Sequence, residues 1–460
     1  MSLPIPAGFE LGVATSAWQI EGDVAGRGLS TWDEFAARPG TIRDGSTGEP
    51  ACDHVHRLRE DLDLLGWLGV EHYRFSISWP RVMPGGVGAL ASSGLDFYDR
   101  LVDGLLERGI TPAATLYHWD LPLELEQAGG WPHRDTAHRF ADYAEAVVGH
   151  FSDRVDRWLT LNEPWCTAFL GYAAGYFAPG MTDPHASLAA AYHLILGHGL
   201  AVPRMRAAGA DSVGIALNVI PMIAETPDVA VQTRHLDGLQ NRLFLELVAG
   251  RGVPADLVDS CASVTDWSFV RDEDRAVMGA PLDWIGENYY TVTRIAPAGT
   301  PGEAAIGADL SAFPATPEVA FAPRPPFTDM GWEVYPPGLR MALEQISDAL
   351  PGVPIWVTEN GAAVPEVEDE TGIHDAWRSE YLHDHIETLI RARADGLDIR
   401  GHYTWSLFDN LEWASGWTMR FGIIRVDPAT GRRTPKDSAH WLRRVIAERR
   451  LPSPESRPDA

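Results

Sequence analysis

The stretch that decides the fold is LDFYDRLVDGLLERGITPAATLY, residues 95–117. Its first half carries apolar residues at helical spacing, all on one face: Leu95, Tyr98, Leu101, Val102, Leu105 and Leu106. Gly109 is placed to end this helix, and an apolar run from Thr111 to Tyr117 follows at once. The stretch therefore predicts one amphipathic helix that leads directly into one buried strand.

The same unit recurs along the chain. Seven more apolar runs alternate with helical patterns, at Phe9–Ala17, His72–Ile77, Arg157–Leu161, Ser212–Val219, Trp284–Tyr290, Pro354–Thr358 and Gly401–Leu407. Strands that alternate with helices favour parallel pairing with the helices outside. Eight units predict an α/β fold, a single (β/α)8 TIM barrel with its active site at the C-terminal ends of the strands.

We place this barrel at residues 1–450 and expect residues 451–460 to form a disordered tail. The stretch Pro297–Phe327 is rich in Ala, Pro and Gly, and we expect it to be a long surface loop near the mouth of the site. An open doubly wound sheet is the alternative fold. It requires a glycine fingerprint directly after a strand, and the matching spacing at residues 86–91 follows Pro84 and Gly85 instead.

Composition limits the possible partners. The chain has 460 residues, 45% of them hydrophobic and 22% charged, as in an ordinary globular protein. Its net charge of −27 disfavours nucleic acids and anionic membranes, so a neutral small molecule is the expected ligand. We expect no charge-free segment of membrane-spanning length and no export signal. Three cysteines are too few for a disulfide framework, which predicts a cytoplasmic location. Monomer and homo-oligomer both remain open.

Polar residues follow the predicted strands where each one ends. In chain order they are Gln19 and Glu21; Arg74; His118, Trp119 and Asp120; Asn162 and Glu163; Asn218; Asn288 and Tyr290; Glu359 and Asn360; and Trp405 with Asp409, Glu412 and Trp413 beyond. This set suits a neutral sugar, because amides, imidazole and carboxylates bind hydroxyls while indole rings stack on the C–H faces of a pyranose.

Two of these residues carry the chemistry of acetal hydrolysis. That reaction needs one carboxylic acid to protonate the leaving oxygen and one carboxylate to meet the developing positive charge. Glu163 and Glu359 meet this requirement. A separation of about 5 to 5.5 Å would give a covalent intermediate and retained configuration, whereas a wider gap would admit water and give inversion. A single isolated Glu could equally be a buried ion-pair partner, but two at strand ends beside Asn residues favour catalysis.

The motifs around these residues resemble those of glycoside hydrolase family 1, the β-glucosidase and β-galactosidase family. Residues 160–166 (TLNEPWC) and 357–361 (VTENG) resemble its two catalytic signatures. Further matches, in chain order, are residues 9–17 with Gln19, Glu21 and Gly22, then 73–81, 118–120, 288–290, 405–410 and 420–423. The resemblance covers nearly the whole chain.

The resemblance implies roles for the matching residues. Glu163 would be the acid/base and Glu359 the nucleophile, with Arg74 and Tyr290 holding Glu359 in its charged form and Asn288 supporting Glu163. Residues expected on the sugar side are Gln19, His118, Trp119, Asn162, Trp405, Glu412, Trp413 and Phe421. Those expected on the aglycone side are Trp165, Phe177, Asn218 and Trp332. No cofactor or metal is implied, and the implied ligand is a β-glucoside, with β-galactosides and β-fucosides as related substrates.

Several positions depart from the common family pattern. Phe177 stands where His is frequent, Leu411 where Phe is frequent, and Trp417 where Tyr is frequent, while Glu287 occupies a position that is usually apolar. These departures bear on the leaving group, and we expect Phe177 to favour apolar or aryl aglycones.

Three other functions fit the sequence less well. Family members that act on 6-phosphorylated sugars typically carry Ser where this chain has Glu412, and a carboxylate there would repel phosphate. A non-catalytic sugar-binding barrel would lack one of the two glutamates, and neither is missing. A metal-dependent barrel hydrolase could use the pairs His54–His56 and His383–His385, but both fall in predicted helices away from strand ends and without an obvious third ligand.

Overall fold

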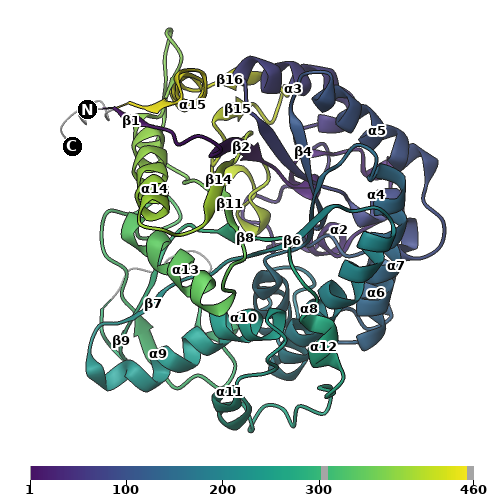
Figure 1. Ribbon diagram of the computed structural model, residues 1–460, viewed down its shortest axis with the longest axis vertical. Coiled ribbons are helices and arrows are strands. Elements are labelled where there is room, and N and C mark those ends of the chain that lie inside the picture. The colour runs from purple at the N-terminus through teal and green to yellow at the C-terminus, as the bar shows by residue number, and fades with distance from the viewer. Residues whose placement is uncertain (1, 302–308, 453–460) are drawn as a thin grey trace.

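The computed structural model describes residues 2–301 and 309–452, and eight parallel strands close into a barrel at its centre (Figure 1). Around the ring they are β11 (Ile355–Asn360), β14 (Ile399–Trp405), β2 (Glu10–Ala14), β3 (His72–Ser76), β4 (Thr111–Tyr117), β5 (Arg157–Asn162), β6 (Ser212–Leu217) and β8 (Trp284–Asn288). The ring closes because β8 pairs with β11, also in parallel. The predicted (β/α)8 barrel is confirmed, and the open doubly wound sheet was the wrong alternative.

Every predicted strand position holds a barrel strand, but some ends differ. The first was expected to reach Ala17, yet it stops at Ala14 because Ser16 is the N-cap of helix α1 (Ala17–Ile20). The seventh was expected to stop at Thr358, yet β11 continues to Asn360 and so includes Glu359. In both places polar residues at the mouth of the barrel obscure the apolar pattern that marks a strand.

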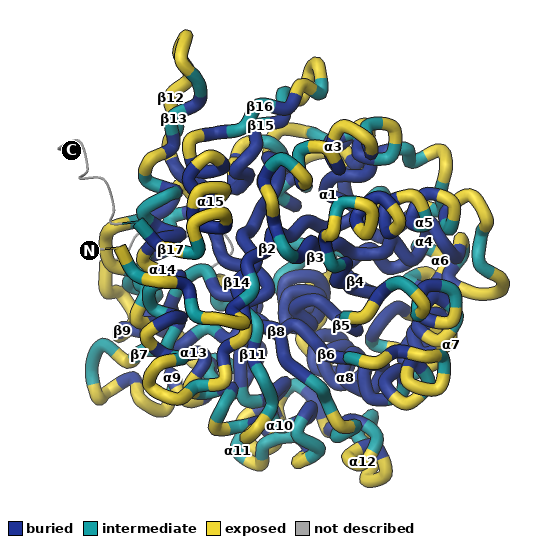
Figure 2. Tube along the Cα trace, turned by 45° about the horizontal axis from the view of Figure 1, so that its top comes forward, coloured by how far each residue is buried: buried dark blue, intermediate teal, exposed yellow. Residues whose placement is uncertain are grey.

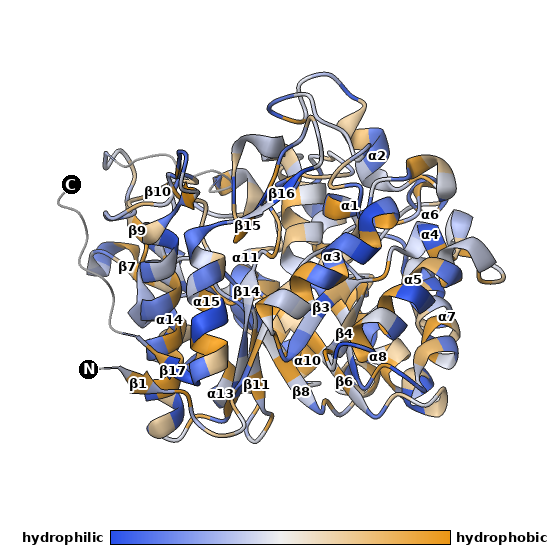
Figure 3. Ribbon diagram, turned by 90° about the horizontal axis from the view of Figure 1, so that it is seen from above, coloured by the Kyte–Doolittle hydropathy of each residue, from blue (hydrophilic) through white to orange (hydrophobic). Residues whose placement is uncertain are grey.

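Helices surround the barrel and present their polar faces outward, as the blue faces of α3, α5 and α15 show in Figure 3. The longer ones are α3 (His54–Leu68), α5 (Ser92–Leu106), α7 (Arg134–Phe151), α8 (Pro184–Ala207), α9 (Ala230–Asp237), α10 (Leu243–Val248), α13 (Pro336–Ala349), α14 (Ala376–Ala394) and α15 (Asp437–Glu448). The helix predicted from residues 95–106 is α5. Gly109 lies just beyond it with a φ of 69°, a left-handed conformation that favours glycine.

Helix α8 corrects one expectation from the sequence. Residues 184–203 contain no Asp, Glu, Lys or Arg, so α8 is long and apolar enough to cross a membrane by length and composition. However, 89% of its most apolar window is buried inside the protein. Figure 2 shows α8 largely in the dark blue of buried residues. It is therefore packed as a core helix, and its apolar character reflects burial on nearly all sides.

The stretch predicted as a surface loop, Pro297–Phe327, is only partly irregular. It contains β10 (Val319–Phe321), which pairs with β9 (Thr293–Pro297), and β9 pairs with β7 (Met222–Ala224). These three strands lie together at one side of the molecule (Figure 3). Phe313 and Phe321 from this stretch line the main cavity, as expected for a segment at the mouth of the site. Residues 302–308 lie outside the described residues.

The predicted boundary between residues 450 and 451 falls inside the last strand. Residue 451 belongs to β17 (Arg450–Leu451), which pairs antiparallel with β1 (Leu3–Pro4). Leu451 is fully buried, so it belongs to the folded domain, while residues 453–460 lie outside the described part of the chain.

The remaining elements are short. They include α2 (Thr31–Ala36), α4 (Trp79–Val82), α6 (Leu123–Gln127), α11 (Ala255–Ser260), α12 (Asp274–Met278), the strand pairs β12 (Val367–Glu368) with β13 (Ile373–His374) and β15 (Ile424–Val426) with β16 (Arg433–Pro435), and π-helices at Cys166–Ala173 and Gly238–Arg242. Among the tryptophans outside the site motifs, Trp158 and Trp441 are buried in the core, and Trp67 is partly buried under Arg443.

Candidate active site

A cavity of about 440 Å³ is lined by residues from the C-terminal ends of the barrel strands and the loops that follow them. The sequence-predicted residues that line it are His118, Trp119, Glu163, Trp165, Phe177, Asn218, Asn288, Tyr290, Trp332, Glu359, Trp405, Glu412, Trp413 and Phe421. The structure thus brings together side chains from three barrel strands, β8, β11 and β14, and from the loops that follow these and other strands. This is the location at which barrel enzymes place their chemistry.

Glu359, near the end of β11, is held by two donors. Arg74 Nη1 on β3 donates to its Oε1 at 2.5 Å, and the Tyr290 hydroxyl donates to its Oε2 at 2.7 Å. Arg74 is fully buried and is itself fixed by the Thr115 hydroxyl, which accepts from Nε at 3.1 Å. The two donors therefore hold the Glu359 carboxylate in one orientation.

Glu163 follows directly after β5 and is held by neutral donors. Asn288 Nδ2, at the end of β8, donates to its Oε1 at 2.7 Å, and the Cys166 thiol donates to its Oε2 at 3.1 Å. Glu163 has a φ of 43°, and Trp119 and Trp413, which line the same cavity, also have positive φ. Such backbone conformations are costly for these residue types and cluster at functional sites.

A hydrogen-bonded network links the two glutamates. Asn162 Oδ1 accepts from Arg74 Nη2 at 2.6 Å and from Asn288 Nδ2 at 2.9 Å. The same arginine contacts Glu359 and the same asparagine contacts Glu163. The two carboxyl groups are therefore positioned relative to each other by a continuous network across β3, β5, β8 and β11.

The surroundings set different protonation behaviour for the two acids. Burial, followed by the negative charge of Glu359, raises the pKa of Glu163 to about 8. Burial also raises the pKa of Glu359, although Arg74 and Tyr290 oppose this rise. The expected stabilisation of the Glu359 anion by Arg74 is present, but burial outweighs it, so the net direction is upward. Because a positive charge faces Glu359, it loses its proton before Glu163.

Glu412 is a third buried acid in the cavity. Burial raises its pKa to about 8, and the charges of Glu359 and Glu163 act in the same direction. Gln19 Nε2 lies 3.5 Å from its Oε2 and donates more closely to Leu411 O, at 2.8 Å. With its pKa raised to about 8, Glu412 is largely protonated at neutral pH, so simple charge repulsion by Glu412 is a weaker argument against phosphate than the sequence suggested.

Aromatic rings form one wall of the cavity. His118 stacks between Trp405 and Trp413, with ring centroids 5.8 and 5.9 Å away, and Trp119 packs on Trp413 at 4.3 Å. Phe177 packs on Trp119 at 5.3 Å and lies 6.3 Å from Trp413. It also packs on Trp32 and Tyr176, both at 5.2 Å, and its predicted place on the aglycone side stays a prediction.

Three predicted residues lie behind the wall. Arg74, Asn162 and Gln19 are fully buried and are not part of the cavity lining. Arg74 binds Glu359, Asn162 accepts from Arg74 and Asn288, and Gln19 binds the Asn410–Glu412 segment. Direct contacts of Gln19 and Asn162 with sugar hydroxyls remain predictions.

The sequence did not identify several residues of the outer cavity, namely Leu170, Ile220, Arg294, Phe313, Phe321 and Glu333. They come from the π-helix Cys166–Ala173, from β9 and β10 and from loops outside the barrel strands, where no motif marks them. The aromatic residues in the stretch 297–327 were the available signal. Cys166 was also missed as a site residue, although its spacing of three from Glu163 places it one helical turn away.

Glu287 is a buried acid outside the cavity. Its Oε2 accepts from the Val219 backbone N–H at 3.2 Å, while Oε1 has no hydrogen-bond partner among the described residues. Burial raises the pKa of Glu287 well above its usual range. Its burial matches the apolar environment that the family pattern implies at this position.

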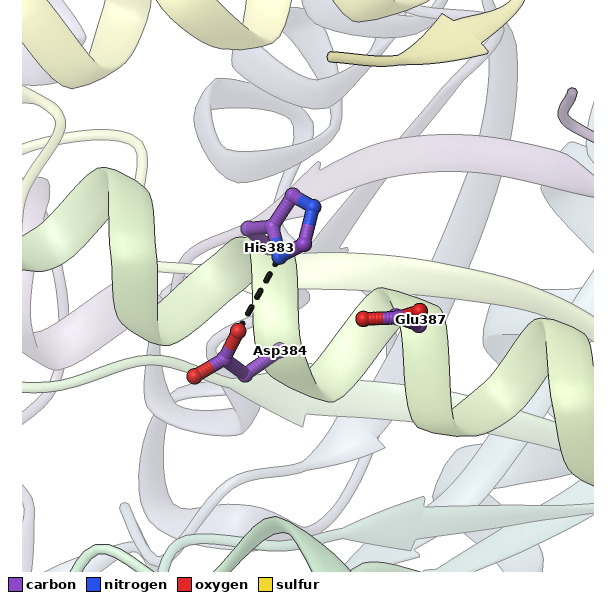
Figure 4. Close-up of side chains that lie close together, drawn as sticks. All are labelled: His383, Asp384 and Glu387. Atoms are coloured by element: carbon purple, nitrogen blue, oxygen red, sulfur yellow. Dashed lines mark hydrogen bonds and ion pairs between the residues drawn. The ribbon is translucent and has the colours of Figure 1, made fainter. Parts of the chain in front are cut away.

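The His-x-His pairs do not form a common site. His54 binds Asp61 and His385 binds the Tyr381 carbonyl, both in buried positions. On α14, however, His383, Asp384 and Glu387 place ligand-type atoms within 4.8 Å of one another (Figure 4). This group differs from the predicted pair, because Asp384 and Glu387 replace His385 as the neighbours of His383. None of the three lines the cavity.

Comparison with known proteins agrees with this geometry. The model of Glycosyl hydrolase family 1 matches residues 1–451. A thermostable β-glucosidase B from Thermobispora bispora is 43% identical, with 96% of this chain and 91% of that protein covered. A bifunctional β-D-glucosidase/β-D-fucosidase from Bifidobacterium breve is 42% identical, with 97% and 99% covered.

The fold is shared at similar identity with solved structures. A psychrophilic β-glucosidase from Micrococcus antarcticus matches with a TM-score of 0.93 and 42% identity, and 96% of this chain and 97% of that chain are covered. A barrel of eight parallel strands, two network-linked glutamates in its mouth and similarity over almost the whole length lead to one conclusion: the chain belongs to glycosyl hydrolase family 1.

Proposed function

We propose that the protein is a retaining β-glycosidase, a β-glucosidase that releases terminal non-reducing β-D-glucosyl residues from oligosaccharides and from aryl and alkyl glycosides. The observation that carries this proposal is the arrangement of Glu163 and Glu359 in one cavity, linked through Arg74, Asn162 and Asn288 but held by different donors.

In the first step Glu359 attacks the anomeric carbon while Glu163 gives its proton to the leaving oxygen. The bond to the aglycone breaks, a glycosyl–Glu359 ester forms, and the aglycone leaves as an alcohol. The charged partner of Glu359 suits a nucleophile, and the raised pKa of Glu163, about 8, suits an acid that must hold its proton at neutral pH.

In the second step water hydrolyses the ester. Once Glu359 is esterified its charge is gone, so one cause of the raised pKa of Glu163 disappears. Glu163 then ionises more readily and can accept a proton from the attacking water. Two displacements at one carbon return the original anomeric configuration.

The sugar is proposed from the site and from the relatives together. Carboxyl, imidazole and amide groups near the aromatic wall suit an uncharged pyranose. Relatives described as a β-glucosidase and as a β-glucosidase/β-fucosidase support glucosyl as the main substrate and fucosyl as a related one. Galactosyl is proposed from the resemblance of the motifs alone.

A 6-phosphorylated sugar is a poorer fit. Arg294 is the cationic side chain of the described cavity lining, and it already forms an ion pair with Glu333 at 2.8 Å. A phosphate dianion would face three acids, Glu163, Glu359 and Glu412, without a free cation. A purely sugar-binding barrel is also disfavoured, because it has no need of an acid with a raised pKa beside a second carboxyl group.

The test combines stereochemistry with a nucleophile variant. Proton NMR of the first sugar released from p-nitrophenyl β-D-glucoside should show the β-anomer, and rates on aryl β-glucoside, β-galactoside and β-fucoside should rank the sugars. Glu359→Ala should abolish turnover of all three, whereas Glu107→Ala, at the exposed C-cap of α5, should not. An α-anomer as first product would overturn the retaining mechanism, and turnover surviving in Glu359→Ala would overturn the nucleophile assignment.

We also propose a cytoplasmic location. All three cysteines, Cys52, Cys166 and Cys261, are free and buried, which is typical of a protein that folds in a reducing compartment. Cell fractionation checks this, and recovery of the activity outside the cell membrane would contradict it.

A further inference from the structure

Cys166 lines the cavity, and its contact with Glu163 is not explained by the reaction described above. It begins the π-helix Cys166–Ala173, is 7% exposed, and lines the cavity beside Glu163. The other two cysteines lie outside the cavity lining. A thiol at this place contacts the carboxyl group to which we assign proton transfer.

The contacts of Cys166 give its S–H one direction. The sulfur accepts from Asn218 Nδ2 at 3.6 Å and donates to Glu163 Oε2 at 3.1 Å. The backbone of Asn218 is in turn fixed by Gln240 Nε2, which donates to the Asn218 backbone carbonyl at 3.0 Å. Because a donor already occupies one side of the sulfur, the thiol hydrogen is directed at the carboxyl oxygen.

We propose that Cys166 is a positioning residue for the acid/base: its thiol donates to Oε2 of Glu163, orients that carboxyl group and favours its ionised form. The inference rests on the proposed function, because it explains the contact between Cys166 and Glu163 by the role of Glu163 in proton transfer. Asn288 fixes the other oxygen, so the two donors together define the plane of the carboxyl group.

The thiol can act as a donor throughout the working pH range. Burial, and then the charge of Glu163, raise the pKa of Cys166 well above its usual range, so the S–H remains protonated. A hydrogen bond to the charged form of a carboxyl group lowers its pKa. Loss of the thiol should therefore raise the pKa of Glu163.

Other groups also face Glu163 and must stay constant in the test. They are Glu359 on β11, Arg74 on β3, Glu287 on β8, Tyr290 after β8 and Glu412 after β14. None of them is hydrogen-bonded to Cys166, so a substitution there leaves their contacts in place.

The test uses two variants of nearly equal shape. Cys166→Thr keeps a donor on the β-carbon, and Cys166→Val replaces it with a methyl group. In the pH profile of kcat/KM on p-nitrophenyl β-D-glucoside, Cys166→Val should move the basic limb to higher pH by about half a unit or more, while Cys166→Thr stays near wild type. Cys261→Ala, which removes a buried thiol elsewhere, should leave the limb unmoved.

Two results would overturn the proposal: equal shifts in Cys166→Thr and Cys166→Val, which would assign the effect to packing, or no shift in either. If Cys166→Val does not fold, Cys166→Ala tests the same direction with a smaller side chain. A wild type without glycosidase activity would count against the proposed function, whereas an active Cys166→Val with an unmoved limb would count against this inference alone.

Infrared spectroscopy tests the bond without turnover. The S–H stretching band that disappears in Cys166→Ala should move to lower wavenumber as the pH rises and Glu163 ionises, because an anion is the stronger acceptor. In Glu163→Gln the band should lose this pH dependence. A Cys166 band that is insensitive both to pH and to Glu163→Gln would show that the thiol does not donate to this carboxyl group.

Discussion

Two clusters of charged residues occupy opposite ends of the same barrel. At the N-terminal end, Glu10, the first residue of β2, accepts from Arg157 Nη1 and Nη2 at 2.6 and 3.2 Å and from Trp356 Nε1 at 2.7 Å, with His72 Nε2 3.3 Å away. At the C-terminal end, Glu163, Glu359 and Glu412 share a cavity, and Arg74 binds one of them.

The two clusters shift acidity in opposite directions. Burial alone would raise the pKa of Glu10, but Arg157 and His72 outweigh it and the net pKa is lowered. Burial and a neighbouring anion raise the pKa of Glu163 to about 8. At the N-terminal end, called the closed end below, the acid is paired with positive charge, which suits stability. At the C-terminal end, called the open end below, acids outnumber their cationic partners, which suits reactivity.

The largest expected effect separates activity at the two ends. Glu163→Gln should lower kcat/KM on an alkyl β-glucoside by roughly 10²- to 10⁴-fold, because the substituted amide cannot give up a proton. Glu10→Gln, the same change at the other end, should leave kcat/KM close to wild type. Steady-state rates on both variants decide this, and similar losses in the two would remove the functional distinction between the ends.

The pH profile should carry the signature of the open end. Activity needs Glu359 ionised and Glu163 protonated, so kcat/KM should form a bell and fall above about pH 8, by roughly tenfold per unit. The measurement is kcat/KM of the wild type across the range in which the fold is stable. A rate that stays flat well above this pH would show that Glu163 is not the group that must hold the proton.

Stability should respond at the closed end. Glu10→Gln leaves Arg157, whose side chain is 15% exposed, without its charged partner. We expect a loss of about 1–3 kcal/mol in the free energy of unfolding, less than for a fully buried pair. Urea unfolding measures it, with Glu344→Gln in the exposed Arg340–Glu344 pair as the matched control, for which little change is expected. Equal effects in the two would argue against a special role for the closed end.

The last comparison concerns how the free energy of unfolding of Glu163→Gln and of the wild type depends on pH. Glu163 has a folded pKa of about 8 against an ordinary value of 4.5, so the folded state binds its proton more tightly. The resulting stabilisation is fully present below pH 4.5 and is lost as the pH rises towards 8. Glu163→Gln escapes this loss, so its free energy of unfolding should rise relative to that of the wild type between pH 5 and pH 8.

Glu10→Gln provides the opposite control for that experiment. Because the pKa of Glu10 is lowered, its stabilisation is present above its ordinary value of 4.5 and is lost only as the pH falls below that. Its deficit should therefore be constant between pH 5 and 8. Parallel trends for the two variants would show that the pH dependence does not come from the site.

The barrel was predictable because each strand and helix carries its own local pattern. The apolar face of residues 95–106 and the run Thr111–Tyr117 required no knowledge of distant residues, and both are confirmed. Strand ends were less predictable. At Ser16 and at Glu359 the polar residues that form the site interrupt the alternation that marks a strand.

The gathering of Glu163 and Glu359 in one cavity could also be predicted, because a parallel barrel brings all C-terminal strand ends together. The contacts that tune them could not. The thiol of Cys166 on Glu163, the burial that raises the pKa of Glu359, and the outer residues Phe313 and Phe321 depend on how loops and helices pack. No spacing in the sequence encodes that packing.

The pairing of β1 with β17 has a practical consequence. Leu3 lies opposite Leu451, and the Arg449 side chain donates to the Phe9 carbonyl, so the first and last strands fasten to each other beside the barrel (Figure 1). A short peptide inserted between these neighbours would turn the chain into a ring. New ends could then be opened in an exposed loop such as residues 88–89, giving a permuted enzyme with the same cavity.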